Sequence, residues 1–331
     1  MYKKNQYLVS KKVKIWQLMV IAIAGCILAI SCTTAPITPL RIVSTVWLGY
    51  EPLFLARDLG YFADTPIQII EAAGHAPGIK KFINGDVELS TMTLDIALEN
   101  AAVQNDIKAF MVLDISDGAD ALIVRPDIEK ISDLKGKRIG LMPATLGKLV
   151  LARALETANL TLDDVNIVTL ALPLQEKAFQ TNEVDALVTF DPMLTNLQMQ
   201  GAKPLFDSAQ MPGEIIDLLV GRADVATTHA QQLKVLLEGW FKALQYMKTN
   251  PEDAIARIAE REGMTGEQVA RGLSQLFFPS VTENTAIFEQ SDISFVEGMK
   301  RLAAFLEQQQ ILTTTINPLS LLDSRPLKSM S

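Results

Sequence analysis

Cysteine and histidine are scarce in this chain of 331 residues, and both cysteines, Cys26 and Cys32, fall within the first 32. The rest of the chain therefore offers no disulfide, no thiolate zinc site and no thiol nucleophile. The two histidines, His75 and His229, stand far apart in the sequence, and without cysteine such a pair argues against a zinc site. The sequence predicts neither a metal nor a cofactor.

Clusters of positive charge are also missing. The formal net charge is −8, and the only charges in the first 31 residues are five lysines, so removal of that segment takes the net charge to −13. Such an acidic protein is a poor candidate for binding nucleic acid or anionic lipid. A phosphate-binding loop is absent as well, because six residues separate Gly140 from Gly147 and Leu149 stands where Ser or Thr is required. This spacing excludes nucleotide hydrolysis.

The first 31 residues have the pattern of a bacterial export signal, with lysines followed by an apolar run from Ile15 to Ile30. The run is short for a membrane span, although an uncleaved amino-terminal anchor remains the alternative. Each cysteine resembles the lipid acceptor of a lipoprotein signal. Cys26 has the better preceding residues, but Cys32 is followed by a polar tether, so we predict lipidation at Cys32 with Cys26 as the alternative. Residues 1–31 would then be a signal peptide and 32–40 a linker, with the protein held by lipid on the outer face of the cell membrane.

The segment Arg41–Phe62 predicts a strand followed by a helix. Residues 42–46 form a short run rich in β-branched residues, which predicts a strand. Pro52 suits the first turn of a helix, and the apolar residues after it recur at helical spacing. Trp47 and Tyr50 fall between the two elements, at the carboxyl end of the strand. In open α/β sheets this is the edge at which ligands bind.

Four motifs resemble those of one family. They are W-x-G-Y-E-P-x-x-L-A-x-x-L-G-Y-F at Trp47–Phe62, the G-x-x-D-like step at Gly85–Thr91, DLKGKRIG at Asp133–Gly140 and VDALVTFDP at Val184–Pro192. In these residues the chain resembles periplasmic substrate-binding proteins of ABC importers, in the nitrate/sulfonate/taurine (NitT/TauT) group. That group also includes binders of riboflavin and thiamine precursors. The resemblance covers about residues 41 to 310.

Strand and helix patterns alternate along the chain, which predicts an α/β protein. The resemblance implies the type II periplasmic-binding-protein fold, with two lobes and a hinge of two crossing segments. Each lobe would be a mostly parallel sheet flanked by helices. Lobe 1 would comprise residues 38–120 and 217–331, and lobe 2 residues 121–216. We expect the polar tail after Leu312 to be loosely ordered.

The predicted ligand-binding residues lie at strand ends and at the two crossings, where this fold places its cleft. They are Trp47, Tyr50, Glu51, Thr93, Asp95, Ser116, Asp117, Thr145, Asp191 and Asp217. One of the two aromatics could instead pack in the core, and Asp95 could instead cap a helix. Asp120 could stabilise the hinge, and His75 is either a cleft contact or a surface residue.

The charge of these residues bears on the ligand. Burying unpaired carboxylates beside an anion costs roughly several kcal/mol. The arginines near the crossings, Arg125 and Arg222, are few. An aromatic or amine-bearing ligand, such as a pyrimidine or another vitamin precursor, is therefore favoured over a bare anion.

The resemblance implies a monomeric solute-binding lipoprotein that delivers its ligand to permease and ATPase subunits, with no covalent chemistry. One alternative is an enzyme like the pyrimidine synthase of thiamine biosynthesis, for which His75, Lys80 and Lys81 are suggestive. That family carries a cysteine-rich motif that is missing here, and an export signal does not fit it. A second alternative is an extracytoplasmic sensor.

Overall fold

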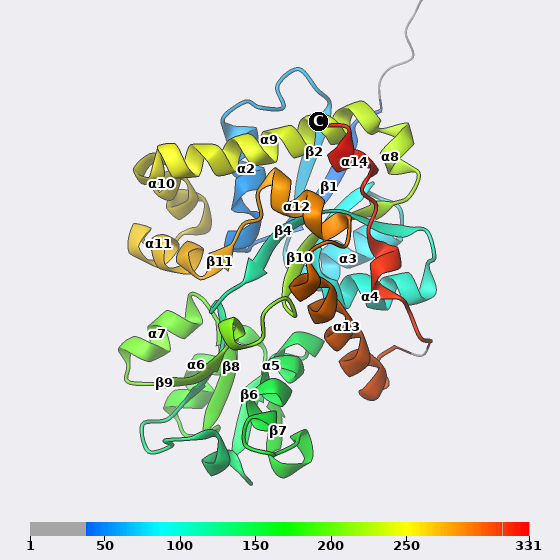
Figure 1. Cartoon of the computed structure of the whole chain (residues 1–331). Helices are drawn as coiled ribbons and strands as arrows, with labels where there is room; N and C mark the ends of the chain where they lie inside the picture. The colour runs from blue at the N-terminus through cyan, green and yellow to red at the C-terminus, as the bar shows by residue number, and fades with distance from the viewer. Residues whose placement is uncertain (1–37, 313, 331) are drawn as a thin grey trace, which may run out of the picture. The chain divides into compact units, whose positions relative to one another are not determined.

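The computed structural model describes residues 38–312 and 314–330 (Figure 1). The chain separates into two units, 1–39 and 40–331, and the fold below is that of the second. The predicted export signal, with Cys26 and Cys32, lies outside the described residues. Within the described part, no helix has the length and apolar character needed to cross a membrane.

The first sheet has six strands in the order β11-β4-β10-β3-β1-β2. They are β1 (Leu40–Thr45), β2 (Ile67–Ala72), β3 (Leu89–Thr93), β4 (Ile107–Ser116), β10 (Ile216–Arg222) and β11 (Leu276–Phe277). β1 pairs in parallel with β2 and β3, and β10 lies antiparallel between β3 and β4. β1, β2, β3 and β4 therefore all run in one direction.

The second sheet has five strands in the order β7-β6-β8-β5-β9. They are β5 (Asp120–Val124), β6 (Arg138–Leu141), β7 (Asn166–Thr169), β8 (Ala186–Phe190) and β9 (Lys203–Asp207). Here β5 is the strand that runs against the other four. The predicted fold of two mostly parallel sheets is confirmed, with β5 and β10 as antiparallel insertions beside the two crossings and the short β11 antiparallel at the edge of the first sheet. β5 begins one residue before the predicted start of lobe 2, and we keep the predicted lobe limits as a proposal.

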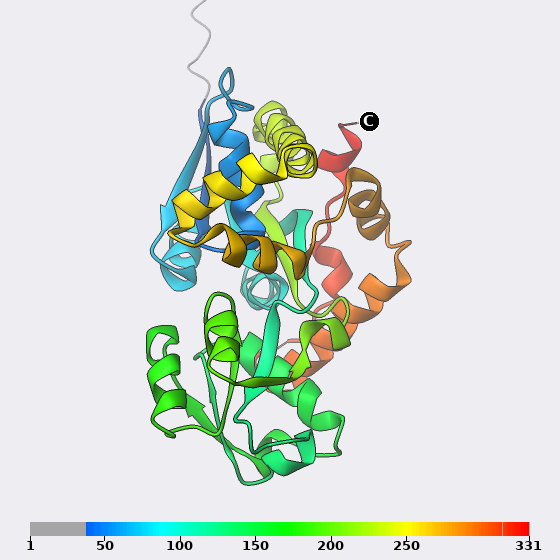
Figure 2. The same cartoon turned by 90° about the vertical axis from the view of Figure 1, so that its left-hand side faces the viewer.

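Helices flank both sheets, as Figures 1 and 2 show. Those connecting the first strands are α2 (Glu51–Asp58), α3 (His75–Ile83) and α4 (Leu94–Val103), and those of the second sheet are α5 (Thr145–Glu156), α6 (Leu172–Gln180) and α7 (Met193–Met199). After β10 come α8 (Val225–Thr228), α9 (Ala230–Thr249), α10 (Pro251–Glu262), α11 (Gly266–Ser274), α12 (Val281–Phe288), α13 (Ile293–Gln308) and α14 (Arg325–Lys328). Trp240 of α9 is buried in the core, as its position on an apolar helical stripe predicts.

The prediction of a loosely ordered tail after Leu312 is wrong for the described residues 314–330. Leu321 and Leu327 are buried, at 2% and 1% exposure. Leu322 forms a parallel bridge with Ala109 of β4, and the Asp323 N–H donates to the Ala109 carbonyl at 3.0 Å. A few leucines and prolines in a largely polar segment suffice to dock it, because each buried leucine contributes about 1.5–3 kcal/mol.

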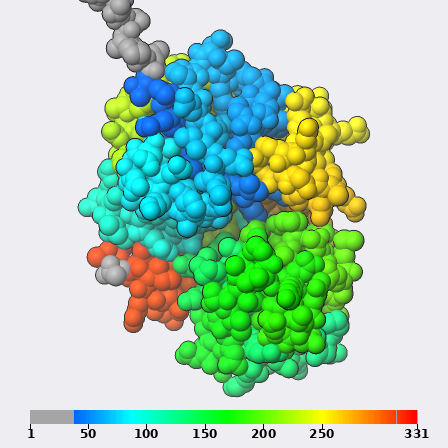
Figure 3. Space-filling model, turned by 180° about the vertical axis from the view of Figure 1, so that it is seen from behind, coloured from blue at the N-terminus to red at the C-terminus, as the bar shows by residue number. Residues whose placement is uncertain are grey.

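The strand directions set the position of the candidate site. β1, β3 and β4 end at the same edge of the first sheet, and β10 begins there because it runs the other way. Both crossings, residues 117–119 and 208–215, leave from this edge toward the second sheet. Figure 3 shows the seam where the green atoms of the second sheet's elements meet the blue and yellow ones of the first. Residues at these strand ends are therefore brought together.

Candidate functional site

The connection from β1 to α2 brings two aromatic side chains to the seam. Tyr50, in the 3-10 helix η1 (Leu48–Tyr50), is fully buried, and its hydroxyl donates a hydrogen bond to Asp217 Oδ1. Trp47 is partly exposed and meets the ring of Phe190 in β8 edge to face, with centroids 5.7 Å apart and planes at 85°. Trp47 therefore reaches the second sheet. Tyr50 instead packs in the core of the first sheet, which agrees with the alternative that one of the two aromatics is a core residue.

Two aspartates face each other across neighbouring strands at this edge. Asp217 of β10 is the register partner of Asp114 in β4 and of Thr93 in β3. Asp114 is fully buried, and neither of its carboxylate oxygens has a hydrogen-bond partner. The carboxylate occupies the space that a side chain at Gly49 would need, because a Cβ there would lie 2.0 Å from Asp114 Oδ2.

The indole N–H of Trp47 is beside the same carboxylate. A Cβ on Gly49 would also lie 2.5 Å from Trp47 Nε1, yet Nε1 makes no hydrogen bond of acceptable geometry. The indole N–H is thus near enough to oppose the rise in the pKa of Asp114, although the two groups do not form a well-aligned hydrogen bond. Buried polar groups are nearly always hydrogen-bonded in folded proteins, so this arrangement calls for a further partner.

Burial and mutual repulsion shift the acids toward their neutral forms. Burial, reinforced by the charge of Asp217, raises the pKa of Asp114 well above its usual range. Burial raises the pKa of Asp217 to about 7, against the opposing effect of the hydrogen bond from Tyr50. Burial likewise raises the pKa of Asp120 to about 6, opposed by the hydroxyl of Ser116. These are the shifts expected when like charges share a site without cations.

Asp95 and His75 form the side of the site nearest α3 and α4. Asp95 lies in the first turn of α4, is 4% exposed, and leaves Oδ1 without a partner. Burial raises the pKa of Asp95. Burial also lowers the pKa of His75, opposed by the charge of Asp95. The first-turn position agrees with a helix-stabilising role for Asp95, and ligand contact by either residue stays a prediction.

Ser116 and Asp120 join the two crossings. The Ser116 hydroxyl is 2.8 Å from Asp120 Oδ2, to which it donates, and 2.7 Å from the hydroxyl of Ser208. Ser208 Oγ also accepts the Gly118 N–H at 2.7 Å. These bonds link the first crossing to the second, which is the hinge role considered for Asp120. The Asp117 side chain is exposed, and only its backbone N–H is engaged, with the Gln275 carbonyl.

Glu51, unlike these acids, is paired with a cation. Its carboxylate, 1% exposed, accepts two hydrogen bonds from the guanidinium of Arg261 in α10. Arg261 also pairs with Glu71 at 2.7 Å and lies 3.8 Å above the centre of the Phe54 ring. Because Arg261 satisfies both Glu51 oxygens, the structure gives Glu51 a part in attaching α10 to α2.

Two predicted residues come from the second sheet. Thr145, at the start of α5, donates to Glu99 Oε1 of α4 at 3.1 Å. Asp191 follows β8, and its Oδ1 accepts the N–H and the hydroxyl of Thr195 at 2.8 and 2.7 Å. Asp191 Oδ2 is buried without a partner and lies 3.7 Å from a Cβ position on Gly272 of α11. Both side chains therefore face elements of the first sheet's side.

The structure thus gathers most of the predicted residues at one seam and sets two apart. Those at the seam are Trp47, Tyr50, Thr93, Asp95, Ser116, Thr145, Asp191 and Asp217. Glu51 is set apart by its pairing with Arg261, and Asp117 by its exposed side chain, although its backbone lies in the first crossing. Asp114 and Phe190 were not singled out from the sequence. Asp114 lies near the carboxyl end of β4, and only the pairing with β10 reveals its neighbour Asp217.

The two candidate arginines are engaged elsewhere. Arg125 donates to the Phe179 carbonyl at 3.2 Å and lies over that residue's ring. Arg222 donates to the Phe82 carbonyl at 3.2 Å and lies over the Phe82 ring. Over residues 38–312 and 314–330, no Lys or Arg forms an ion pair with any of the four buried acids at the edge of the first sheet and the first crossing, Asp95, Asp114, Asp120 and Asp217.

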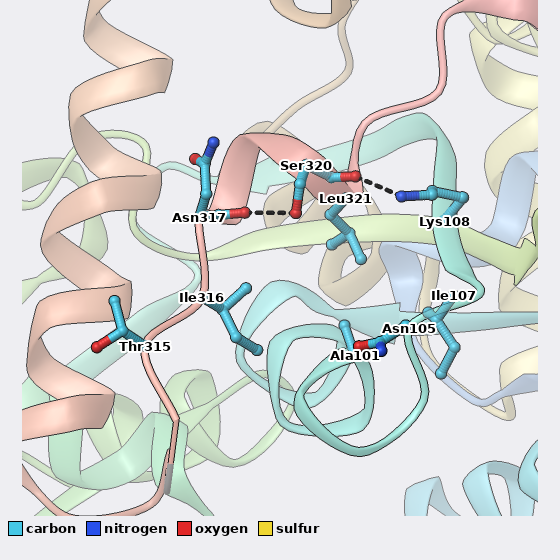
Figure 4. A pocket seen from close by; sticks show the side chains of 9 residues that line it. All are labelled: Ala101, Asn105, Ile107, Lys108, Thr315, Ile316, Asn317, Ser320 and Leu321. Carbon is cyan, nitrogen blue, oxygen red and sulfur yellow. Dashed lines mark hydrogen bonds between the residues drawn. The ribbon is translucent and has the colours of Figure 1, made fainter.

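A metal does not explain these acids, since the described residues contain no group of three or more side chains that could hold one. A pocket of about 230 Å³ lies elsewhere, between the end of α4, the start of β4 and residues 315–321 (Figure 4). Lys108 donates to the Ser320 carbonyl beside it, at 2.7 Å. This pocket adjoins the amino end of β4, whereas Asp114 lies near the carboxyl end of the same strand. The pocket is therefore separate from the seam.

Comparison with known proteins gives a consistent result. A protein-family model described as "NMT1/THI5 like" matches residues 48–254. The taurine-binding periplasmic protein of Escherichia coli (strain K12) is 26% identical over 195 residues, covering 56% of this chain and 61% of that protein. The match thus spans less than two thirds of that relative's length.

Solved structures share the fold. The periplasmic aliphatic sulphonate binding protein SsuA of Escherichia coli superposes with a TM-score of 0.72 at 18% identity, over 87% of this chain and 98% of that one. The desulfurization enzyme DSZB gives a TM-score of 0.66 at 15% identity, over 88% of this chain and 98% of that one. The same fold therefore occurs in a binding protein and in an enzyme.

Proposed function

Because the chain belongs to the NMT1/THI5-like family, we propose that it is an extracytoplasmic solute-binding protein that holds a small organic molecule between its two sheets. The family resemblance seen in the sequence motifs is confirmed by this membership. Delivery to the permease and ATPase subunits of an ABC importer completes the proposal. The ligand would favour the form in which the two sheets approach, and so shift the population toward it.

One observation carries the proposal: buried polar atoms without partners lie on both sides of the seam. Asp114 and Trp47 supply them from the first sheet's edge, and Asp191 from the second. In open α/β folds this edge is the usual place for a ligand. A molecule bound there would satisfy groups that the protein leaves unsatisfied, which a purely structural role does not explain.

Two crossings connected by the Ser116, Asp120 and Ser208 side chains suit a hinge. Short segments that take up backbone rotation between two rigid bodies are the usual basis of domain closure. Contacts across the seam include partly exposed polar pairs, such as Thr145 with Glu99 and Arg271 with Gln198, which break at small cost. On the side of α13, Arg153 of α5 and Arg301 of α13 both pair with buried Glu214 in the second crossing, which keeps the two bodies joined beside the hinge.

The relatives support a small organic ligand. Taurine and aliphatic sulphonates are named for the two Escherichia coli proteins. We propose the same extracytoplasmic location for this chain, with the lipid anchor at Cys32 or, alternatively, Cys26. Separate Cys32→Ser and Cys26→Ser variants test the anchor: only the variant of the acceptor should move from the membrane fraction to the soluble one. Equal behaviour of both variants would contradict it.

An enzyme on the same fold is the second candidate, since DSZB is one. The chain beyond residue 32 has no cysteine, and the Ser116 hydroxyl, which donates to buried Asp120, also contacts Ser208 in the hinge and is bonded to no histidine or lysine of the described residues. We therefore favour binding without chemistry, and keep a synthase-like enzyme and an extracytoplasmic sensor as alternatives. A ligand recovered unchanged after prolonged incubation supports binding, and a converted ligand supports an enzyme.

Native mass spectrometry on residues 33–331, purified without added ligand, is the direct experiment. We expect a bound small molecule that is lost on unfolding, and a weaker complex in Trp47→Ala. Phe277→Ala is the matched control, because Phe277 is an exposed aromatic in β11. The proposal fails if the protein is empty and a thermal-shift panel of sulfonates, amines and pyrimidines produces no stabilisation.

A further inference from the structure

Unsatisfied acceptors outnumber unsatisfied donors at the seam. The buried acceptor oxygens without partners are Asp95 Oδ1, Asp114 Oδ1 and Oδ2, Asp191 Oδ2 and Thr45 Oγ1, which is itself also able to donate. Against these stands one obligatory donor, Trp47 Nε1. A ligand that completes this site must therefore bring hydrogen-bond donors. A sulfonate or carboxylate, which only accepts, could pair with the Thr45 hydroxyl but would leave the ionised carboxylate oxygens unsatisfied.

The charge at the seam points the same way. Asp95, Asp114, Asp120 and Asp217 are each at most 6% exposed, and none is paired with a Lys or Arg of the described residues. Glu99 of α4 adds a further acid, and burial together with the charge of Asp95 raises its pKa. In their ionised forms these acids would repel an anion at low dielectric, whereas a bound cation would stabilise the ionised forms and oppose the effect of burial.

The cations nearest in the fold are already committed. Arg261 is held by Glu51, Glu71 and Glu262, and lies over the Phe54 ring. Arg271 donates to Gln198. On α3, His75 has its pKa lowered by burial, which favours the uncharged imidazole. Arg271 keeps its charge because Gln198 is neutral, but no Lys or Arg of the described residues is paired with the four seam acids, so a ligand can supply the missing cation.

The aromatic pair adds a surface that suits such a ligand. Trp47 and Phe190 meet edge to face from opposite sheets, beside the Asp114 carboxylate. The face of an indole attracts an organic cation by about 0.5–2 kcal/mol, depending on its desolvation. The two rings can touch only when the two sheets are together, so a ligand that contacts both rings would stabilise the closed form.

We propose that this site takes a small organic cation, whose protonated nitrogen donates hydrogen bonds to Asp114 and Asp217 while its body lies against Trp47 and Phe190. This inference rests on the proposed solute-binding function and specifies its ligand class. Asp114 carries it, as a fully buried carboxylate with both oxygens unpaired beside the seam. Taurine, named for the Escherichia coli relative, is compatible because it carries an ammonium group as well as a sulfonate.

The test uses matched probes on the purified full-length chain, read by thermal shift and calorimetry. The first pair is taurine and 2-hydroxyethanesulfonate, which differ only in the ammonium group. The second set is benzylammonium, benzyl alcohol and phenylmethanesulfonate. We expect stabilisation by at least one ammonium probe, with its hydroxyl counterpart at least tenfold weaker and the purely anionic sulfonate inactive.

Variants locate the effect. Asp217→Asn and Asp114→Asn should each weaken the ammonium probe about 10- to 100-fold, the loss expected for a charge-assisted hydrogen bond. Asp64→Asn is the matched control, because Asp64 is exposed and remote from the seam in sequence and sheet position. Neither variant should alter the already weak binding of the hydroxyl probe.

Two results overturn the inference. One is a sulfonate or hydroxyl probe that stabilises the protein as well as its ammonium counterpart, in which case solute binding stands and only the ligand class is wrong. The other is the absence of any ammonium effect at millimolar concentration while native mass spectrometry shows a retained ligand without a basic nitrogen. If no ligand of any charge binds in either experiment, the proposed function fails together with the ligand class.

Discussion

Replacing Asp217 by Asn should make the protein more stable at pH 8 and leave its stability near pH 4 almost unchanged. Asn keeps the shape of the side chain and can still accept the hydrogen bond from the Tyr50 hydroxyl. What it removes is a buried, repelled negative charge. The prediction therefore separates the cost of that charge from the value of the hydrogen bond.

The sign follows from linkage. Burial raises the pKa of Asp217 from 3.8 to about 7, so between these values the folded protein holds a proton that the unfolded chain has lost. The stabilising contribution of this group is fully present below pH 3.8 and is lost as pH rises through about 7. At 1.36 kcal/mol per pKa unit, the difference amounts to at most about 4 kcal/mol, an upper bound because the native structure can relax around the charge.

Urea unfolding at several pH values from 4.5 to 8 measures this directly. In the wild type the free energy of unfolding should fall across the range, by up to about 1.4 kcal/mol per pH unit for each titrating acid. Asp217→Asn should flatten the curve, whereas the exposed-site control Asp64→Asn should leave it unchanged. Glu88 and Asp185 do not confuse the result, because ion pairs lower their pKa and place their effects below this window. Glu51 does contribute within it, since burial raises its pKa to about 8 against the opposing hydrogen bonds from Arg261, but this contribution is common to both proteins and cancels when the variant is compared with the wild type.

Two outcomes would refute the reasoning. Wild-type stability that rises from pH 5 to pH 8 would mean that the acids at the seam are not protonated more readily in the folded state. An Asp217→Asn variant destabilised by the same amount at every pH would mean that the carboxylate is satisfied in a way that Asn cannot reproduce.

Three further predictions concern packing. Arg261→Met should lower the free energy of unfolding in urea by about 3–5 kcal/mol, because Glu51 would stay buried without its partner. Adding Glu51→Gln should recover part of the loss, and a cost below about 1 kcal/mol for Arg261→Met would contradict this prediction. Gly49→Ala should cost about 1–3 kcal/mol by displacing Asp114, and a neutral result would show that the carboxylate can move away freely. Leu321→Ala should cost about 2–5 kcal/mol if the carboxyl-terminal segment is docked, and almost nothing if it is loose.

The sequence predicts the order and type of most elements because their signals are local. The first βα unit is a β-branched run followed by Pro52 and a helical stripe, and the structure has β1 and α2 there. The buried stripe of α9 around Trp240 is equally local. The prediction for the segment after Leu312 is wrong for the same reason. Leu321 and Leu327 lie among polar residues in the sequence, and the surface on which they pack comes from distant parts of the chain such as β4.

The site is harder to predict, because its neighbours come from distant parts of the chain. Asp114 and Asp217 are brought together by the antiparallel insertion of β10 beside β4, a pairing that no local pattern encodes. The partner of Glu51, Arg261, is 210 residues away. The sequence near a carboxylate at a strand end therefore does not show whether that carboxylate forms a buried ion pair or stays unpaired at the seam. Only the tertiary structure distinguishes the two cases.

That distinction ties stability to function in this chain. Glu51 is buried beside a cation and contributes to holding α10, whereas the acids at the seam are buried beside one another and lower the stability of the ligand-free protein. Local violations of good packing and charge pairing are expected at functional sites, where a ligand supplies what the fold omits. Under the proposed cation binding, the free energy lost to these unpaired carboxylates is recovered on closure around the ligand. The same residues that weaken the empty protein would then favour the closed form only when the correct charge is present.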